Sequence, residues 1–139
     1  MRSLFGFGGN KLKEEVNKID KDIEELLKRL RGPADSTLDE SNIKNAKNLI
    51  KKISENIEQY KELLESRYRK LGDFQEINKL KESINNLLKI LEYTYEKFYK
   101  TKKITQNEMM EYIRMGVRDV EYFWKKHRYE LSELGIIKK

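Results

Sequence analysis

Histidine and cysteine are the side chains that most often hold metals or act as bases and nucleophiles, and this chain has one histidine, His127, and no cysteine. Zinc sites need several Cys or His ligands, so a zinc centre is not expected. Di-iron helical bundles take Glu-x-x-His pairs from facing helices, whereas the residue three positions before His127 is Trp124. We therefore expect neither a metal nor a cofactor.

His127 itself has two interpretations. It lies along or beside the apolar positions Val120, Trp124 and Leu131, which favours a partly buried histidine that is hydrogen-bonded within the core. The alternative is a general base, but no serine or cysteine nucleophile pattern accompanies it. The Gly-Phe-Gly-Gly run at 6–9 has no preceding strand and no following Gly-Lys-Thr, so it does not indicate a phosphate-binding loop. The sequence favours binding or assembly over catalysis.

Basic side chains are the second group with a recognisable chemistry. The chain has 30 lysines and arginines against 24 acids, a net charge of +6. If consecutive helices run antiparallel, the ends of the second and fourth helices meet and bring basic and aromatic residues together. Such a cluster contacts the phosphate backbone of a nucleic acid without reading its sequence. The predicted nucleic-acid contacts are Arg67, Tyr68, Arg69, Lys70, Lys125, Lys126, Arg128 and Tyr129.

The same charges also have a simpler interpretation. Lysine and arginine near helix C-termini stabilise the helix dipole and need no ligand for that role. Acidic residues, among them Glu130 and Glu133, belong to the same end of the predicted bundle and weaken its positive field. A net charge of +6 is moderate for a nucleic-acid-binding protein of this size. Both interpretations stay open from the sequence.

Aromatic residues gather near the end of the third predicted helix, where Tyr93 and Tyr99 lie off the narrow apolar stripe. Aromatics are enriched in protein interfaces, so these two predict contact with a protein partner or with a second copy of the chain. A wider core at that level is the alternative. Phe5 and Phe7 predict a further apolar contact, with a partner, a neighbouring subunit or a lipid surface. Their segment is too short for stable membrane insertion.

The composition indicates a helical protein with few hydrophobic residues beyond those that a core needs. Of its 139 residues, 39% are charged and 37% hydrophobic, so we expect thin apolar seams and broad polar faces. The absence of cysteine favours an intracellular, cytoplasmic setting. No stretch approaches the roughly 18 apolar residues of a membrane span. Pro33 is the one proline, and a chain with few breakers has long elements.

Four segments carry apolar residues at helical spacing. They are predicted to run from about Asn10 to Arg31, from Leu38 to Leu71, from Asp73 to Phe98 and from Thr105 to Leu134. The first stripe, from Leu12 to Leu30, alternates steps of four and three, as in a coiled coil. Thr105 and Glu108 have capping-box spacing at the start of the fourth helix, and Gly135 ends it.

Short connections between long helices force antiparallel neighbours. We therefore predict an all-α fold, an elongated antiparallel (up-down-up-down) four-helix bundle with short loops. Residues 10–135 form its single domain, between a flexible N-terminal tail at 1–9 and a short C-terminal tail at 136–139. The predicted function is non-enzymatic: helical faces bind a protein partner or form a homodimer. Sequence-independent nucleic-acid binding by the basic end is the alternative.

Overall fold

A computed structural model describes residues 4–31, 40–68 and 75–137 of the chain. These residues form α1 (Leu4–Arg31), α2 (Glu40–Tyr68), α3 (Gln75–Thr94), a π-helical segment (Tyr95–Lys100) and α4 (Gln106–Glu133). Those three ranges contain no strand. Each α-helix packs against the next in sequence, and α1 also packs against α4. The predicted all-α helical bundle is confirmed.

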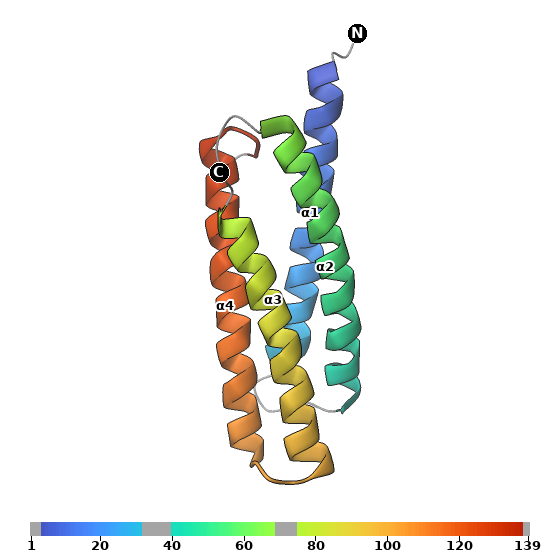
Figure 1. Ribbon diagram of the computed structural model, residues 1–139, viewed down its shortest axis with the longest axis vertical. Coiled ribbons are helices and arrows are strands. Elements are labelled where there is room, and N and C mark those ends of the chain that lie inside the picture. Colours follow the sequence, from blue (N-terminus) through green and yellow to red (C-terminus); the bar gives the residue numbers. More distant parts are fainter. Residues whose placement is uncertain (1–3, 32–39, 69–74, 138–139) are drawn as a thin grey trace.

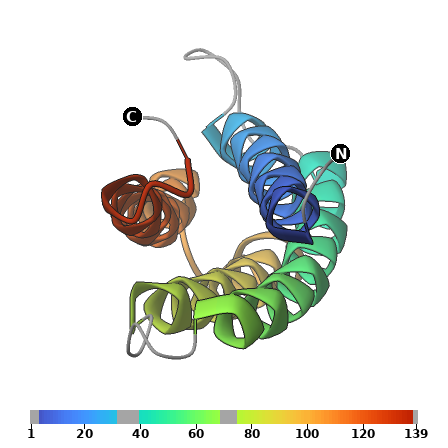
Figure 2. The same cartoon turned by 90° about the horizontal axis from the view of Figure 1, so that it is seen from above.

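Consecutive helices run in opposite directions along the bundle in Figure 1. α1 leads away from the end marked N, α2 returns towards it, and α3 and α4 repeat the pattern. Seen from above, the four helices surround one central core (Figure 2). α1 is displaced along the bundle, so its start projects beyond its neighbours and its end stops short of the turn between α3 and α4.

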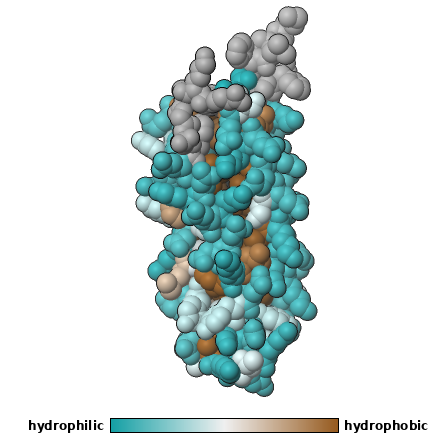
Figure 3. Space-filling model, viewed as in Figure 1, coloured by the Kyte–Doolittle hydropathy of each residue, from teal (hydrophilic) through white to brown (hydrophobic). Residues whose placement is uncertain are grey.

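The apolar stripes predicted from the sequence form this core. The stripes from Leu12 to Leu30 on α1, from Ile43 to Leu64 on α2, from Ile77 to Leu91 on α3 and from Met109 to Leu131 on α4 are buried. Leu134 is an exception at 39% exposed, because it follows the last turn of α4 as its C-terminal cap. The face in Figure 3 is mostly hydrophilic, with hydrophobic residues appearing mainly in strips between helices. Among the described residues, no helix combines the length and apolarity needed to cross a membrane.

Both ends of α4 follow local sequence signals. The Thr105 hydroxyl accepts a hydrogen bond from the Glu108 N–H at 3.1 Å, and the Glu108 carboxylate accepts one from the Thr105 N–H at 3.0 Å, which is the predicted capping box. Gly135 has a φ of 74°, a conformation that favours glycine after a helix. Ile136 then donates its N–H to the Leu131 carbonyl at 2.9 Å and is 6% exposed. Ile136 therefore belongs to the core rather than to the predicted C-terminal tail.

The start of α1 also differs from the prediction. α1 begins at Leu4 rather than near Asn10, so most of the segment predicted as a flexible tail is helical. Phe5 lies seven residues before Leu12, and the heptad spacing of the first stripe therefore continues two turns further towards the N-terminus. The glycines of that segment obscured this continuation, because glycine is a poor helix former.

The third predicted helix changes type before its end. The α-helical pattern stops at Thr94, whose hydroxyl donates to the Ile90 carbonyl at 2.7 Å. Such a side-chain bond competes with the backbone bonds of an α-helix. In the π-helical segment that follows, the Thr101 N–H bonds the Glu96 carbonyl, five residues back, at 2.9 Å. The aromatic residues packed against the core there are Tyr95, Phe98 and Tyr99.

Gly116 allows α3 and α4 to pack closely. A Cβ atom added at this position would lie 2.8 Å from Leu87 Cδ1 and 3.0 Å from Ile90 Cδ1. Leu87 is fully buried, so it has little room to move away. Glycine in mid-helix costs about 1 kcal/mol relative to alanine, and here it avoids a clash between the two helices.

Candidate functional site

The large hydrophobic side chains that are exposed lie on one side of the bundle, within the part of the chain whose side chains are described. Among residues whose side chains are described, six large ones are exposed, with fractions from 39% for Leu134 to 63% for Tyr129. All six belong to α3, to α4 or to the turn that ends α4, and none lies on α1 or α2. They are Tyr93, Tyr112, Met115, Tyr122, Tyr129 and Leu134.

Five of these residues lie on α3 and α4, and we call them together the tyrosine face: Tyr93, Tyr112, Met115, Tyr122 and Tyr129. Met115, Tyr122 and Tyr129 are spaced by seven residues, so they follow one line along α4. Tyr112, one turn earlier, meets Tyr93 of α3 edge to face with ring centroids 5.8 Å apart. The tyrosine face therefore spans both helices.

A groove lies along this surface, between the start of α3 and the second half of α4. We call it the α3–α4 groove; its volume is about 570 Å³. Its lining residues in the described part of the chain are Glu76, Tyr122, Lys125, Lys126, Tyr129 and Glu130. The structure thus brings together three predicted nucleic-acid contacts, but among these described residues two glutamates balance the two lysines.

Tyr122 and Lys126 interact directly within the groove. The Lys126 ammonium lies 5.1 Å from the centroid of the Tyr122 ring. A hydrogen bond with the Tyr122 hydroxyl, and the nearby charge of Glu76, raise the pKa of Lys126. Lys126 therefore carries its positive charge at neutral pH and holds it over an aromatic surface.

The other predicted nucleic-acid contacts do not join this groove. Arg128 is directed towards α1, where its Nη1 lies 3.3 Å from Asp20 Oδ1. Arg67 is half-buried on α2. The predicted basic end is thus divided between opposite sides of α4. Outside the described side chains lie Tyr68, Arg69 and Lys70.

The four predicted interface residues have different surroundings. Tyr93 is 46% exposed and belongs to the tyrosine face. Tyr99 is half-buried against the core and packs edge to face on Phe98, with ring centroids 4.9 Å apart, so less of its ring is available to a partner. Phe5 and Phe7 lie in the helical backbone of α1, and their side chains are outside the described part.

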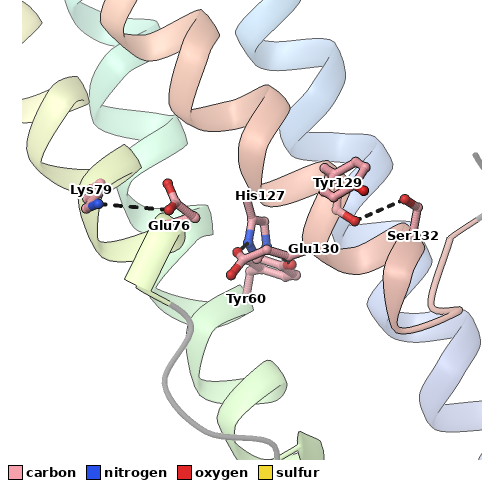
Figure 4. A network of polar contacts seen from close by, with 7 residues as sticks. All are labelled: Tyr60, Glu76, Lys79, His127, Tyr129, Glu130 and Ser132. Carbon is pink, nitrogen blue, oxygen red and sulfur yellow. Dashed lines mark hydrogen bonds and ion pairs between the residues drawn. The ribbon is translucent and has the colours of Figure 1, made fainter.

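His127 is fully buried and has a partner on each ring nitrogen, as the core interpretation predicted. Its Nε2 is hydrogen-bonded to the hydroxyl of Tyr60 on α2, and its Nδ1 lies 3.0 Å from Glu130 Oε1. Figure 4 shows the three side chains grouped between α2 and α4. Burial raises the pKa of Tyr60, and the charge of Glu130 raises it further. Tyr60 therefore keeps its hydroxyl proton. The Glu130 carboxylate can only accept, so Nδ1–H donates to it, and in this tautomer Nε2 accepts from the Tyr60 hydroxyl.

The buried group of Tyr60, His127 and Glu130 has neighbours on both sides of α4. Glu130 also lines the α3–α4 groove, and Figure 4 shows Glu76 of α3 nearby with its ion-pair partner Lys79. On the other side, the Trp124 ring lies 6.1 Å from the His127 ring and donates its N–H to Asp20 of α1 at 2.7 Å. Sequence reasoning missed the role of Tyr60, because a tyrosine on an apolar stripe resembles any other core residue.

The described residues contain no group of three or more side chains suited to holding a metal ion. Comparison of the chain with protein-family models, with curated proteins and with solved structures gives no match. The tyrosine face, the α3–α4 groove and the buried His127 group are therefore the observations from which function is inferred.

Replacing Tyr60 with phenylalanine tests the buried hydrogen bond. The change removes the hydroxyl that is hydrogen-bonded to the buried His127 Nε2, so the free energy of unfolding should fall by about 1–3 kcal/mol, measured by urea denaturation. Above pH 10, the ordinary tyrosine pKa, the unfolded chain ionises Tyr60 while the folded chain, whose pKa is raised, does not. Wild-type stability should therefore lose up to about 1.4 kcal/mol per pH unit through this residue alone.

Tyr122→Phe is the matched control, because its ring is 53% exposed. It should change stability by less than about 0.5 kcal/mol and keep the wild-type loss of stability at alkaline pH. Tyr60→Phe should lack that contribution. A Tyr60→Phe protein as stable as the wild type, with an unchanged alkaline slope, would contradict the buried hydrogen bond.

Proposed function

We propose that this protein is a non-enzymatic helical bundle whose tyrosine face binds a helix of a partner protein or of a second copy of the chain. One observation carries the proposal: the exposed hydrophobic side chains lie on α3 and α4, while α1 and α2 have none among their described side chains. Single exposed hydrophobic residues are ordinary on protein surfaces, whereas a continuous group of them is typical of an interaction site.

The residue types suit a surface that is exposed before it binds. Tyrosine buries a large ring at a small cost in conformational entropy, and its hydroxyl remains compatible with water. Tyrosine and methionine are also enriched in interfaces. The protein can therefore present Tyr93, Tyr112, Tyr122 and Tyr129 to water and cover them later.

The spacing on α4 favours a helix as the occupant. Side chains seven residues apart meet a partner helix at regular intervals, as in a coiled coil. Met115, Tyr122 and Tyr129 have this spacing, and Lys125 and Lys126 stand beside them. A second copy offers the same stripe and is the partner that any purified preparation contains.

The buried histidine supports the non-enzymatic part of the proposal. A general base needs a ring nitrogen within hydrogen-bonding reach of its substrate. His127 is fully buried, and both of its ring nitrogens are engaged, by Tyr60 and by Glu130. Its contacts hold α4 in place beneath the tyrosine face.

Sedimentation equilibrium over a range of concentrations tests the proposal with the second copy as partner. The wild type should show a reversible increase in mass with concentration. Tyr122→Ser combined with Tyr129→Ser should raise the dissociation constant by at least about thirtyfold, since one central interface side chain often contributes about 2 kcal/mol.

Lys44→Ser combined with Lys51→Ser is the control, because both lysines are exposed on α2. This variant should associate as the wild type does. A double tyrosine variant that associates as strongly as the wild type would contradict the tyrosine face as the binding surface. A wild type that is monomeric at every concentration would contradict self-association.

A second candidate function is the binding of single-stranded nucleic acid in the α3–α4 groove. It is favoured by the meeting of the Lys125 and Lys126 amines with the rings of Tyr122 and Tyr129 in one groove. Lysines contact phosphates and aromatic rings stack on bases in proteins that bind single strands. The glutamates of the same lining repel phosphate, which is why this function ranks second.

Fluorescence anisotropy of a labelled single-stranded oligonucleotide, titrated at several salt concentrations, tests this candidate. Lys125→Ala combined with Lys126→Ala should weaken binding and reduce the slope of log affinity against log salt by about 1.4, for two lost phosphate contacts. Lys102→Ala combined with Lys103→Ala, in the α3–α4 turn at the other end of the groove's helices, should leave both unchanged. No binding by the wild type at low salt would exclude this function.

A further inference from the structure

A second hollow lies on the opposite side of α4, where α1 ends beside it. Its volume is about 290 Å³, near the lower limit of small-molecule sites. The described residues that line it are Leu30, Arg31, Met110, Arg114, Val117 and Arg118. It lies near the end of α1, which stops before the turn between α3 and α4 (Figure 1). We call it the arginine hollow.

Three guanidinium groups surround the arginine hollow, and none of its lining residues within 4–31, 40–68 and 75–137 is acidic. Arg31 Nη2 lies 2.9 Å from Glu121, and Arg114 Nη1 lies 2.9 Å from Glu111. Arg118 has no ion-pair or hydrogen-bond partner within the described ranges. Each guanidinium has five N–H donors, so the two paired arginines also retain donors that the glutamates do not use.

The helix dipole does not account for these arginines. A cation in the last turn of a helix stabilises its C-terminus, and this explains Arg31 at the end of α1. Arg114 and Arg118 lie within α4, more than a turn from either end, where the dipole has little effect. Their convergence on one hollow therefore calls for another cause.

The floor of the hollow is apolar. Leu30 and Val117 are buried core residues, and Met110 packs against the core. An apolar floor beneath several guanidinium groups suits a ligand with two parts. Guanidinium binds carboxylate or phosphate through paired hydrogen bonds, and the floor covers an apolar body attached to that head.

We propose that the arginine hollow binds a small organic anion, a phosphate monoester or carboxylate with a short aryl or alkyl body. The anionic head lies between Arg114 and Arg118, with Arg31 completing the positive rim. The apolar body packs on the half-buried Met110, above the buried Leu30 and Val117. This site lies where α1 ends beside α4 and shares no lining residue with the α3–α4 groove. Arg118 borders the tyrosine face, because it is three residues after Met115 and four before Tyr122.

Isothermal titration calorimetry of the full chain tests the site with four probes: phenyl phosphate, benzoate, inorganic phosphate and phenol. Phenyl phosphate should saturate a single site. Inorganic phosphate should bind at least about tenfold more weakly, because it leaves the apolar floor exposed to water. Phenol, which has no charge, should not bind detectably. Benzoate distinguishes a carboxylate site from one that needs phosphate.

Arg118→Gln should weaken the binding of phenyl phosphate at least about tenfold, through loss of a charge-assisted contact. Arg114→Gln is a second test, should Arg118→Gln lose its helical circular dichroism. Arg29→Gln is the matched control: it has the same charge change, lies in the last turns of α1 and pairs with Glu25 at 2.9 Å outside the hollow. It should bind as the wild type does.

Three results would overturn the proposal. The first is no binding of either phenyl phosphate or benzoate to the wild type. The second is equal affinity for phenyl phosphate and inorganic phosphate, which would remove the role of the apolar floor. The third is wild-type affinity in a folded Arg118→Gln or Arg114→Gln protein, which would place the ligand elsewhere.

Discussion

Four narrow apolar stripes, one on each helix, have to be buried together, and the rest of the structure depends on that constraint. Only 37% of the residues are hydrophobic, and most of them are the stripe residues or the partly buried residues packed against the stripes. Among the described side chains, large hydrophobic ones that remain exposed are therefore few. Because these exposed residues lie on α3 and α4, that side of the bundle has a more hydrophobic described surface than the side formed by α1 and α2.

The buried hydrogen bond between Tyr60 and His127 adds specificity to this apolar core. An unpaired polar group in a core is costly, so α2 and α4 are favoured in the register that pairs these two residues. The hydrogen bond from Trp124 to Asp20 favours one register between α1 and α4 in the same way. Fixing α4 in this way also fixes which of its residues face outward, and so fixes the tyrosine face.

The sequence predicted those features that depend on one helix at a time. Apolar spacing identified the stripes, and Thr105 with Glu108 identified the start of α4, because both signals are local. The features that were missed depend on neighbouring helices. The basic residues near the end of α4 lie on different faces of the helix. Arg128 pairs with Asp20 of α1, whereas Lys126 lies near Glu76 of α3. Their closeness in the sequence does not show this separation. The seven-residue spacing of Met115, Tyr122 and Tyr129 is present in the sequence, but their exposure depends on how α4 packs against its neighbours.

The central claim is that the tyrosine face is a binding surface, and amide chemical shifts measured by ¹H–¹⁵N NMR over a dilution series test it most directly. The account predicts concentration-dependent shifts at Tyr93, Tyr112, Met115, Tyr122 and Tyr129, with constant shifts on the exposed faces of α1 and α2. Shifts centred on α1 or α2 would contradict the account, as would constant shifts throughout the spectrum of a protein whose mass increases with concentration.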